Sequence, residues 1–206
     1  MFSFYGLNFV AFKAFTNPSG SKFAQAANWY LSPAGEKYRP ELHQTASLQP
    51  SEHADSLLLG YALEGIRMAG SLGIWRQATA TGAVKEADGR IVQVPAGSQV
   101  FMPSHKVAQD AGQFPNPESV DPRRPLDRYV HYASGPSAFL GKDICNVALV
   151  ELFRALFRKK GLRCVKGPQG MLKQVPRESG LVDYMTEDWG SLTPFPTTMK
   201  ATWGPE

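Results

Sequence analysis

The stretch Tyr132-Ala-Ser-Gly-Pro-Ser-Ala-Phe-Leu-Gly141 follows a long proline-rich segment and directly precedes the most regular helical pattern in the sequence. Its Gly-Pro pair predicts a turn, because glycine adopts backbone conformations that other residues avoid. A helix that begins just after such a turn leaves its first backbone N–H groups without intrahelical partners. The stretch is therefore suited to presenting N–H groups and one side chain to a flat ligand.

The composition is typical of one soluble globular domain, with 206 residues, 43% hydrophobic and 19% charged, and a formal net charge of +4. The absence of any run of five or six basic residues argues against nucleic-acid binding. Cys145 and Cys164 form no CxxC pair and no metal-ligand spacing, so we expect free thiols. No charged signal-peptide region is present, and no stretch reaches the roughly 18 to 20 apolar residues that span a bilayer. These features predict an intracellular, cytoplasmic protein without a transmembrane segment.

The spacing of apolar residues predicts four helices in the first third of the chain. These helices are expected over residues 9–15, 21–31, 36–46 and 51–69. The last is the best defined, because Ser51 is a good N-cap residue and Gly70 is a good stop. Glu64 and Arg67 lie three residues apart in it, so they are neighbours on the helix surface. Taken alone, such a pair is ordinary and contributes a few tenths of a kcal/mol.

The middle of the chain changes from strands to a long loop. Residues 74–102 predict strands, with turn signals at Ala87-Asp-Gly-Arg90 and Pro95-Ala-Gly97. Residues 103–130 hold five prolines and show no sustained period. A loop of this length inside a compact domain usually has a function or covers one.

A second long helix is expected over residues 143–160, capped by Asp143 and stopped by Gly161. Its apolar residues predict a broad buried stripe, made of Ile144, Val147, Ala148, Val150, Leu152, Phe153, Leu156 and Phe157. The tail predicts a hairpin between residues 181–185 and 197–203. Basic side chains cluster near the end of the helix, and they predict either a docking face or simple complementation of the helix dipole. They are Arg154, Arg158, Lys159, Lys160, Arg163 and Lys166.

Several motifs resemble those of the cytochrome P-450 superfamily, in the same order along the chain. Glu64-Gly-Ile-Arg67 resembles the Glu-x-x-Arg of its K helix. The segment Phe114-Pro-Asn-Pro-Glu-Ser-Val-Asp-Pro-Arg-Arg124 resembles its meander. In that comparison Arg124 completes a buried Glu–Arg–Arg cluster that pins the loop to the helix, which is a structural role and not a catalytic one. Charge-assisted and possibly bidentate bonds would hold such a cluster together.

The same resemblance implies a haem site, because Tyr132–Gly141 is similar to the haem-binding loop of the superfamily. The implied haem-binding candidates are Arg76, Tyr132, Gly135, Phe139 and Gly141. Phe139 stands at the position of the ligating cysteine, and a phenyl ring cannot ligate iron. Ser137 stands where the family often has a His or Arg for a propionate, and Cys145 lies too far downstream to replace the thiolate. The resemblance thus implies haem as cofactor, whereas Phe139 argues against thiolate-ligated haem chemistry here.

The resemblance also implies the fold class, which is mainly α with small β-sheets (α+β), as the C-terminal part of a cytochrome P-450 fold. Residues 1–206 would form one partial domain of six segments. These are the K helix (51–69), a β region (74–102), the meander (103–130), the haem loop (132–141), the L helix (143–160) and a C-terminal hairpin region (162–206).

Within the superfamily, the chain is similar to the C-terminal end of fungal linoleate diol synthases, also called psi-factor-producing fatty-acid oxygenases. Glu64-Gly-Ile-Arg-Met-Ala-Gly70, Gly141-Lys-Asp143, Tyr184-Met-Thr-Glu-Asp-Trp-Gly190 and Pro194-Phe-Pro-Thr-Thr-Met199 carry that resemblance. The family implies an unsaturated fatty acid or its hydroperoxide as substrate. It also implies an upstream dioxygenase domain of the peroxidase type, which this chain lacks.

Two functions are therefore open. One is a P-450-like segment of a fatty-acid oxygenase that dioxygenates linoleate or oleate and rearranges the hydroperoxide, with this segment's own activity lost. The other is a non-catalytic packing or oligomerisation module, or a truncated gene product.

Overall fold

The computed structural model describes residues 22–70, 73–86, 88–129, 131–133, 138–177, 182–193 and 199–204. Its helices are residues 22–31, η1 (Glu36–Tyr38), α2 (Arg39–Ser47), α3 (Glu52–Ala69), α4 (Ser104–Ala108), η2 (Leu126–Arg128), α5 (Lys142–Phe157) and η4 (Pro168–Gly170). Its strands are β1 (Ile74–Gln77), β2 (Gly82–Lys85), β3 (Ile91–Val94), β4 (Gln99–Met102), β5 (Arg163–Cys164), β6 (Gln174–Pro176), β7 (Val182–Met185), β8 (Leu192–Thr193) and β9 (Ala201–Thr202). The predicted mixture of helices with small sheets is confirmed. The helix predicted over residues 9–15 lies outside the described residues.

Helix α3 is the central element, and its ends follow from its sequence. The Ser51 hydroxyl accepts a hydrogen bond of 3.2 Å from the Ala54 N–H, which satisfies one of the free donors at the helix start. At the other end, Gly70 adopts a left-handed conformation with φ of 31°. Nearly every residue of the second half of α3 is buried, so this helix is covered on all sides there.

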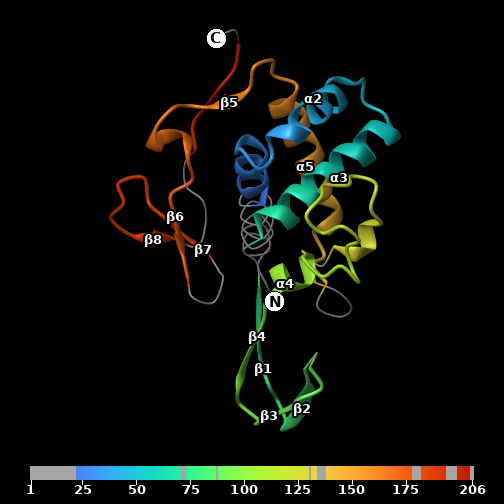
Figure 1. The fold of residues 1–206 in the computed structure, drawn as a ribbon, viewed down its shortest axis with the longest axis vertical. Coiled ribbons are helices and arrows are strands. Elements are labelled where there is room, and N and C mark those ends of the chain that lie inside the picture. Colours follow the sequence, from blue (N-terminus) through green and yellow to red (C-terminus); the bar gives the residue numbers. More distant parts are fainter. Residues whose placement is uncertain are drawn as a thin grey trace, which may run out of the picture.

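The helices pack around α3 to form the core. Helices α2 and α5 both contact α3, and all three lie in the upper part of the molecule (Figure 1). Residues 22–31 add a fourth helix, whose Tyr30 is fully buried between the rings of Tyr61, Phe153 and Phe157. The Tyr30 hydroxyl donates a 2.7 Å bond to the Tyr61 carbonyl, so the buried phenol is satisfied.

Two antiparallel ladders extend from the helices as a long arm, at the bottom of Figure 1. In the first ladder β1 pairs with β4, with Arg76 opposite Val100. In the second, β2 pairs with β3, with Val84 opposite Val92. The arm exposes several apolar side chains, and one of them, Trp75, is exposed although its ring lies 4.7 Å from the Phe101 ring on β4. The exposed apolar side chains of the arm are Trp75, Val84, Ile91, Val92 and Met102.

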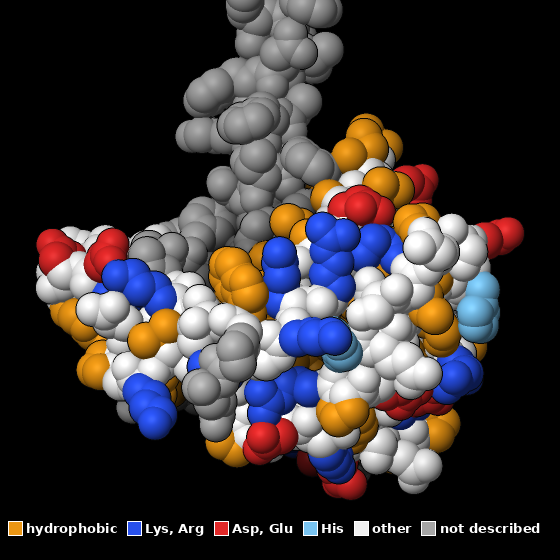
Figure 2. All heavy atoms as spheres, turned by 90° about the horizontal axis from the view of Figure 1, so that it is seen from above, with side chains coloured by type: hydrophobic (Ala, Val, Ile, Leu, Met, Phe, Trp, Pro, Cys, Tyr) orange, Lys and Arg blue, Asp and Glu red, His pale blue; other side chains and the backbone are white. Residues whose placement is uncertain are grey.

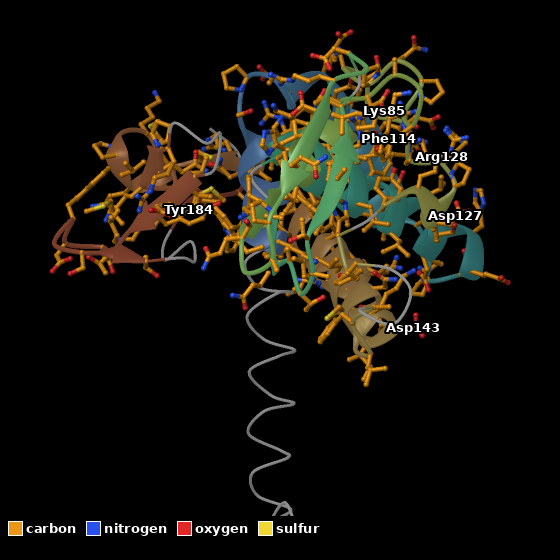
Figure 3. All side chains as sticks on the ribbon, turned by 90° about the horizontal axis from the view of Figure 1, so that it is seen from below. Lys85, Phe114, Asp127, Arg128, Asp143 and Tyr184 are labelled. Carbon is orange, nitrogen blue, oxygen red and sulfur yellow. The ribbon has the colours of Figure 1, made fainter. Side chains whose placement is uncertain are left out.

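The C-terminal sheets correct the predicted hairpin between residues 181–185 and 197–203. Strand β7 pairs with β6 on one side and β8 on the other, whereas β9 pairs with β5. These partners are closer in space than the predicted pair, and the strands are too short to show a reliable alternation in sequence. The Gln25 side chain donates a 2.7 Å bond to the Tyr184 hydroxyl and so attaches the β6–β7–β8 sheet to the helices (Figure 3).

Helix α5 also differs from the sequence prediction. It begins at Lys142 and ends at Phe157, and no side chain caps its first turn, so Asp143 is not the N-cap. Its buried face is narrower than predicted, because Ile144, Val147 and Leu152 are exposed. The side chains that face the core are Cys145, Leu149, Val150, Phe153, Arg154 and Phe157. Across the described residues, no helix combines the length and the apolar character needed to cross a bilayer.

Candidate functional site

Glu64 is the centre of a buried charge cluster. Its carboxylate is fully buried and accepts two bonds from Arg67, one from Nε at 2.7 Å and one from Nη2 at 2.8 Å. The Nε of Arg124 lies 3.4 Å from the same carboxylate. The structure therefore brings Glu64, Arg67 and Arg124 together from a helix and from a loop 60 residues away. The bidentate pair is the strong geometry for a guanidinium and a carboxylate.

The two guanidiniums are also bound by backbone carbonyls of the long loop. Arg67 Nη1 donates to the carbonyls of Ala108, at 3.0 Å, and of Pro117, at 2.6 Å. Arg124 Nη1 donates to the Pro115 carbonyl at 2.7 Å. Further bonds to the carbonyls of Asn116 and Ser119 complete the set. One carboxylate cannot neutralise two guanidiniums, so the carbonyl dipoles stabilise the remaining positive charge.

Tyr129, which the sequence analysis missed, also joins the cluster. Its hydroxyl donates a 2.7 Å bond to Glu64, and the Asp121 N–H donates another at 2.9 Å. Burial and the Glu64 charge raise the pKa of Tyr129 well above its usual value, which keeps the phenol protonated as a donor. The ring of Phe114 lies 5.2 Å from the Arg67 guanidinium. Phe114 begins the segment that resembles the meander, whereas Tyr129 belongs to no motif, so sequence alone could not assign Tyr129 to the cluster.

The loop approaches α3 so closely that one position of the helix must be glycine. A Cβ built on Gly60 would lie 1.9 Å from the carbonyl oxygen of Pro122, well inside van der Waals contact. Pro122 precedes Arg124 by two residues. The close approach at Gly60 therefore sets the position from which Arg124 reaches Glu64.

The loop before α5 carries the haem-binding candidates. The rings of Tyr132 and Phe139 stack, with centroids 6.1 Å apart, and the Phe139 N–H donates a 2.9 Å bond to the Tyr132 carbonyl. A Cβ on Gly141 would lie 2.7 Å from the Phe139 ring, so this ring also fills the space beside Gly141. Gly135 and Ser137 lie outside the described residues. Tyr132, Phe139 and Gly141 are thus brought together.

A buried lysine, also missed from sequence, supports the start of this loop. Lys22 Nζ donates a 2.8 Å bond to the His131 carbonyl and lies 3.7 Å from the Tyr132 ring centroid. Burial lowers the pKa of Lys22 to about 8. Burial and the nearby Lys22 lower the pKa of His131 to about 3, so this imidazole is neutral at physiological pH. Its Nε2 faces the Leu63 carbonyl at 3.3 Å and donates to it.

Arg76 is placed apart from these residues. It lies on β1 in the extended arm, where its side chain is exposed and donates to the carbonyl of its neighbour Trp75 at 2.9 Å. The described hydrogen bonds and ring contacts link Tyr132 with Phe139, and within the described residues none links Arg76 to either. The structure does not bring all haem-binding candidates into contact.

The residues present do not fit a thiolate-ligated haem. Phe139 has no ligating atom, and Cys145 is fully buried on the core face of α5. The buried Tyr132 hydroxyl has no hydrogen-bond partner in the described part of the chain, but burial raises its pKa and disfavours a phenolate ligand. Among the residues that the structure describes, no group of three or more His, Cys, Asp or Glu could hold a metal ion.

Comparison with curated proteins gives close relatives from fungi. A bifunctional dioxygenase–epoxy alcohol synthase of Fusarium oxysporum is 61% identical over 181 residues, which cover 88% of this chain and 14% of that protein. The corresponding Pyricularia oryzae protein is 54% identical over 89% of this chain and 16% of its own length. A linoleate 10R-lipoxygenase of Aspergillus fumigatus is 36% identical over 86% of the chain and 16% of the relative. The chain thus spans only a small part of the length of these relatives.

Solved structures with the same fold are cytochromes P450. The Bacillus subtilis cytochrome P450 PksS gives a TM-score of 0.64 at 18% identity, over 83% of this chain and 40% of that one. The P450 monooxygenase TamI gives a TM-score of 0.60 at 19% identity, over 93% and 41% of the two chains. These likenesses concern the fold alone, and they confirm the expected P450 architecture. No family model matches the chain.

Proposed function

Because the chain belongs to the fungal oxygenase family that includes the dioxygenase–epoxy alcohol synthases, we propose that it is a structural P450-fold segment of an unsaturated fatty-acid oxygenase. The activity proposed for the whole protein is dioxygenation of a fatty acid such as linoleate or oleate. Hydroperoxide rearrangement at the P450-like site is proposed to be lost. The observation that carries this proposal is the phenyl ring of Phe139 at the end of the loop before α5.

The difference between position 139, which lacks a ligating sulfur, and the Glu64 cluster supports the proposal that this segment has a structural role. Thiolate ligation supplies the electron density that cleaves O–O bonds in P450 chemistry, and no sulfur is available at position 139. In the same chain, Glu64, Arg67 and Arg124 retain all their charge-assisted bonds. These bonds hold the loop of residues 103–129 against α3, which is a structural role.

Exposed apolar side chains favour a second, compatible function as a packing module. Ile144 and Val147 on α5, and Ile91 on the arm, are each more than 60% exposed. Ile144 and Val147 lie three residues apart and so are neighbours on the surface of α5, and exposed apolar neighbours of this kind mark an interaction site in many proteins. An upstream dioxygenase domain of the peroxidase type is the partner that we propose for it.

The test is to load the protein with haem and record the spectrum of its ferrous carbon monoxide complex. We expect no thiolate-type red-shifted band for the unmodified protein, and no conversion of linoleate hydroperoxide above a free-haem control. Phe139→Cys is the matched variant. A gain of the band in Phe139→Cys would assign the loss of ligation to this position. A thiolate-type band in the unmodified protein would contradict the proposal.

A further inference from the structure

Helix α5 carries apolar side chains on two faces. The inner face is buried in the core. The outer face carries a second set, which we call the outer stripe and which consists of Ile144, Val147, Ala148 and Leu152. Ile144 is 64% exposed and Val147 is 65% exposed. A helix that is apolar on all sides is normally buried on all sides, so the outer stripe should have a cover.

The outer stripe is confined to the first part of α5. Asp143, which marks the start of this helix, lies at the edge of the molecule in Figure 3. The other end of α5 is polar, since Figure 2 shows Lys and Arg side chains gathered on that face, which is the top of the molecule in Figure 1. Arg158, Lys159 and Lys160 follow the helix directly. The cover must therefore be apolar and must lie near the start of α5.

Residues 2–15, which lie outside the described residues, have the composition that such a cover needs. Five of the twelve phenylalanines of the chain fall in this segment, and Lys13 is its one charged residue. A segment of this kind loses free energy when it is removed from water onto an apolar surface.

The first described residues hold the chain beside α5. Lys22 Nζ donates a 2.8 Å bond to the His131 carbonyl, just before the loop that leads into α5. The next side chain, Phe23, packs against Phe153 of α5 with ring centroids 5.9 Å apart. Residues 2–15 are therefore tethered next to the helix that carries the outer stripe.

The length of the tether is sufficient for this contact. Residues 16–21 read Thr-Asn-Pro-Ser-Gly-Ser, a composition typical of a turn. Six residues span up to about 20 Å when extended. The part of α5 from Ile144 to Leu152 is about 12 Å long at the rise of an α-helix. The segment can thus fold back along the whole outer stripe.

We propose that residues 2–15 pack on the outer stripe of α5 and form an intramolecular cover for it. Glu151 lies one turn after Val147, and its Oε1 is 3.7 Å from Arg154 Nε, so this largely exposed carboxylate can also face the ammonium group of Lys13. A second copy of the chain fits less well. An antiparallel pair of stripes centred on Val147 would bring Glu151 against Ile144 of the other copy, which buries a carboxylate beside an apolar side chain.

The cover has a consequence that rests on the proposed packing function. A dioxygenase domain that docks on α5 must first displace residues 2–15, so the segment controls access to this part of the surface. The contact itself needs no second domain, and it can be tested on this chain alone.

The experiment is photo-crosslinking of the full chain with p-benzoylphenylalanine in place of Ile144, followed by mass spectrometry. We expect crosslinks to residues 2–15 within one chain. Phe9→Ser combined with Phe12→Ser should lower their yield by at least about fivefold, because two phenyl rings then no longer favour burial. In a second measurement, Val147→Asp should speed tryptic cleavage after Lys13 by at least about fivefold, because cleavage follows the population of the open form.

The matched control has p-benzoylphenylalanine in place of Ile91 on β3, a side chain that is also 64% exposed but lies on the arm. It should give no crosslink to residues 2–15. Equal yields from the two positions, or a crosslinked product with the mass of two chains, would overturn the proposal. The second outcome would assign the outer stripe to a dimer interface. The carbon monoxide spectrum of the haem-loaded protein tests the proposed function separately.

Discussion

The Glu64 cluster and the loop of residues 132–141 both depend on groups that come from distant parts of the chain. Only the cluster has all the hydrogen-bond and ion-pair partners that its charges need. Every polar group described around Glu64 has a partner, and five loop carbonyls are bound by two arginines. In the loop, Phe139 replaces a ligand and stacks on Tyr132, while Arg76 lies apart on the arm. The interactions that hold this fold and those that would hold its cofactor can therefore be lost independently.

The largest expected effect is that of Glu64→Gln, which leaves two buried guanidiniums without a negative charge. We expect the free energy of unfolding to fall by roughly 3–5 kcal/mol, the usual cost of removing one partner of a buried ion pair. Urea unfolding followed by circular dichroism measures this difference. Glu118→Gln, an exposed change in the same loop, should be close to neutral. Equal midpoints for the two variants would show that the cluster does not hold the fold.

Gly60→Ala should have the next largest effect, because its methyl group would meet the Pro122 carbonyl. Overpacking of this kind costs about 1–3 kcal/mol. The loss should appear as a lower melting temperature and as faster hydrogen exchange at Arg124. Gly82→Ala is the control, since nothing lies within 4 Å of a Cβ at Gly82. A variant at position 60 that melts like the control would mean that the loop can move away from α3 without loss.

The smallest expected effect is a loss of stability at acid pH, which comes from His131 beside the loop of residues 132–141. Folding lowers the pKa of His131 from 6.5 to about 3, so the unfolded chain binds a proton in a range where the folded chain does not. The contribution of His131 to stability is thus complete above pH 6.5 and falls as the pH drops towards 3. Solvent still reaches part of the imidazole and screens its protonated form, so the loss of stability should stay below that of Gly60→Ala. Urea midpoints for the protein and His131→Gln should converge over this range, and parallel curves would contradict the assignment.

The elements with strong local signals could be predicted from sequence. Ser51 and Gly70 set the bounds of α3, and Glu64, Arg67 and Arg124 were identified through motifs with fixed spacing. The exposure of Ile144 and Val147 could not be predicted, because periodicity shows which residues share a face and not whether another element covers it. The pairing of β5 with β9 could not be predicted either, since strands of two residues have no measurable alternation.

The carbonyl groups that bind Arg67 and Arg124 could not be predicted from sequence either, because every residue has a backbone carbonyl. Only the fold turns those of Ala108, Pro115 and Pro117 towards Arg67 and Arg124. Lys22 and Tyr129 could not be assigned to the site from sequence for a similar reason. Each lies far along the chain from the groups it contacts and carries no motif of its own.

The loop carbonyls that accept hydrogen bonds from Arg67 have a consequence for how residues 103–129 fold. Arg67 donates to the carbonyls of residues that lie 41, 50 and 52 positions further along the chain. The chain must therefore lose the entropy of closing this loop before any of these bonds can form. The backbone bonds within residues 103–129 are local turns and the short helices α4 and η2, which do not by themselves place the loop against α3. Because its buried bonds run to α3, we expect residues 103–129 to become ordered on this helix, and the two should form and open as a single cooperative unit.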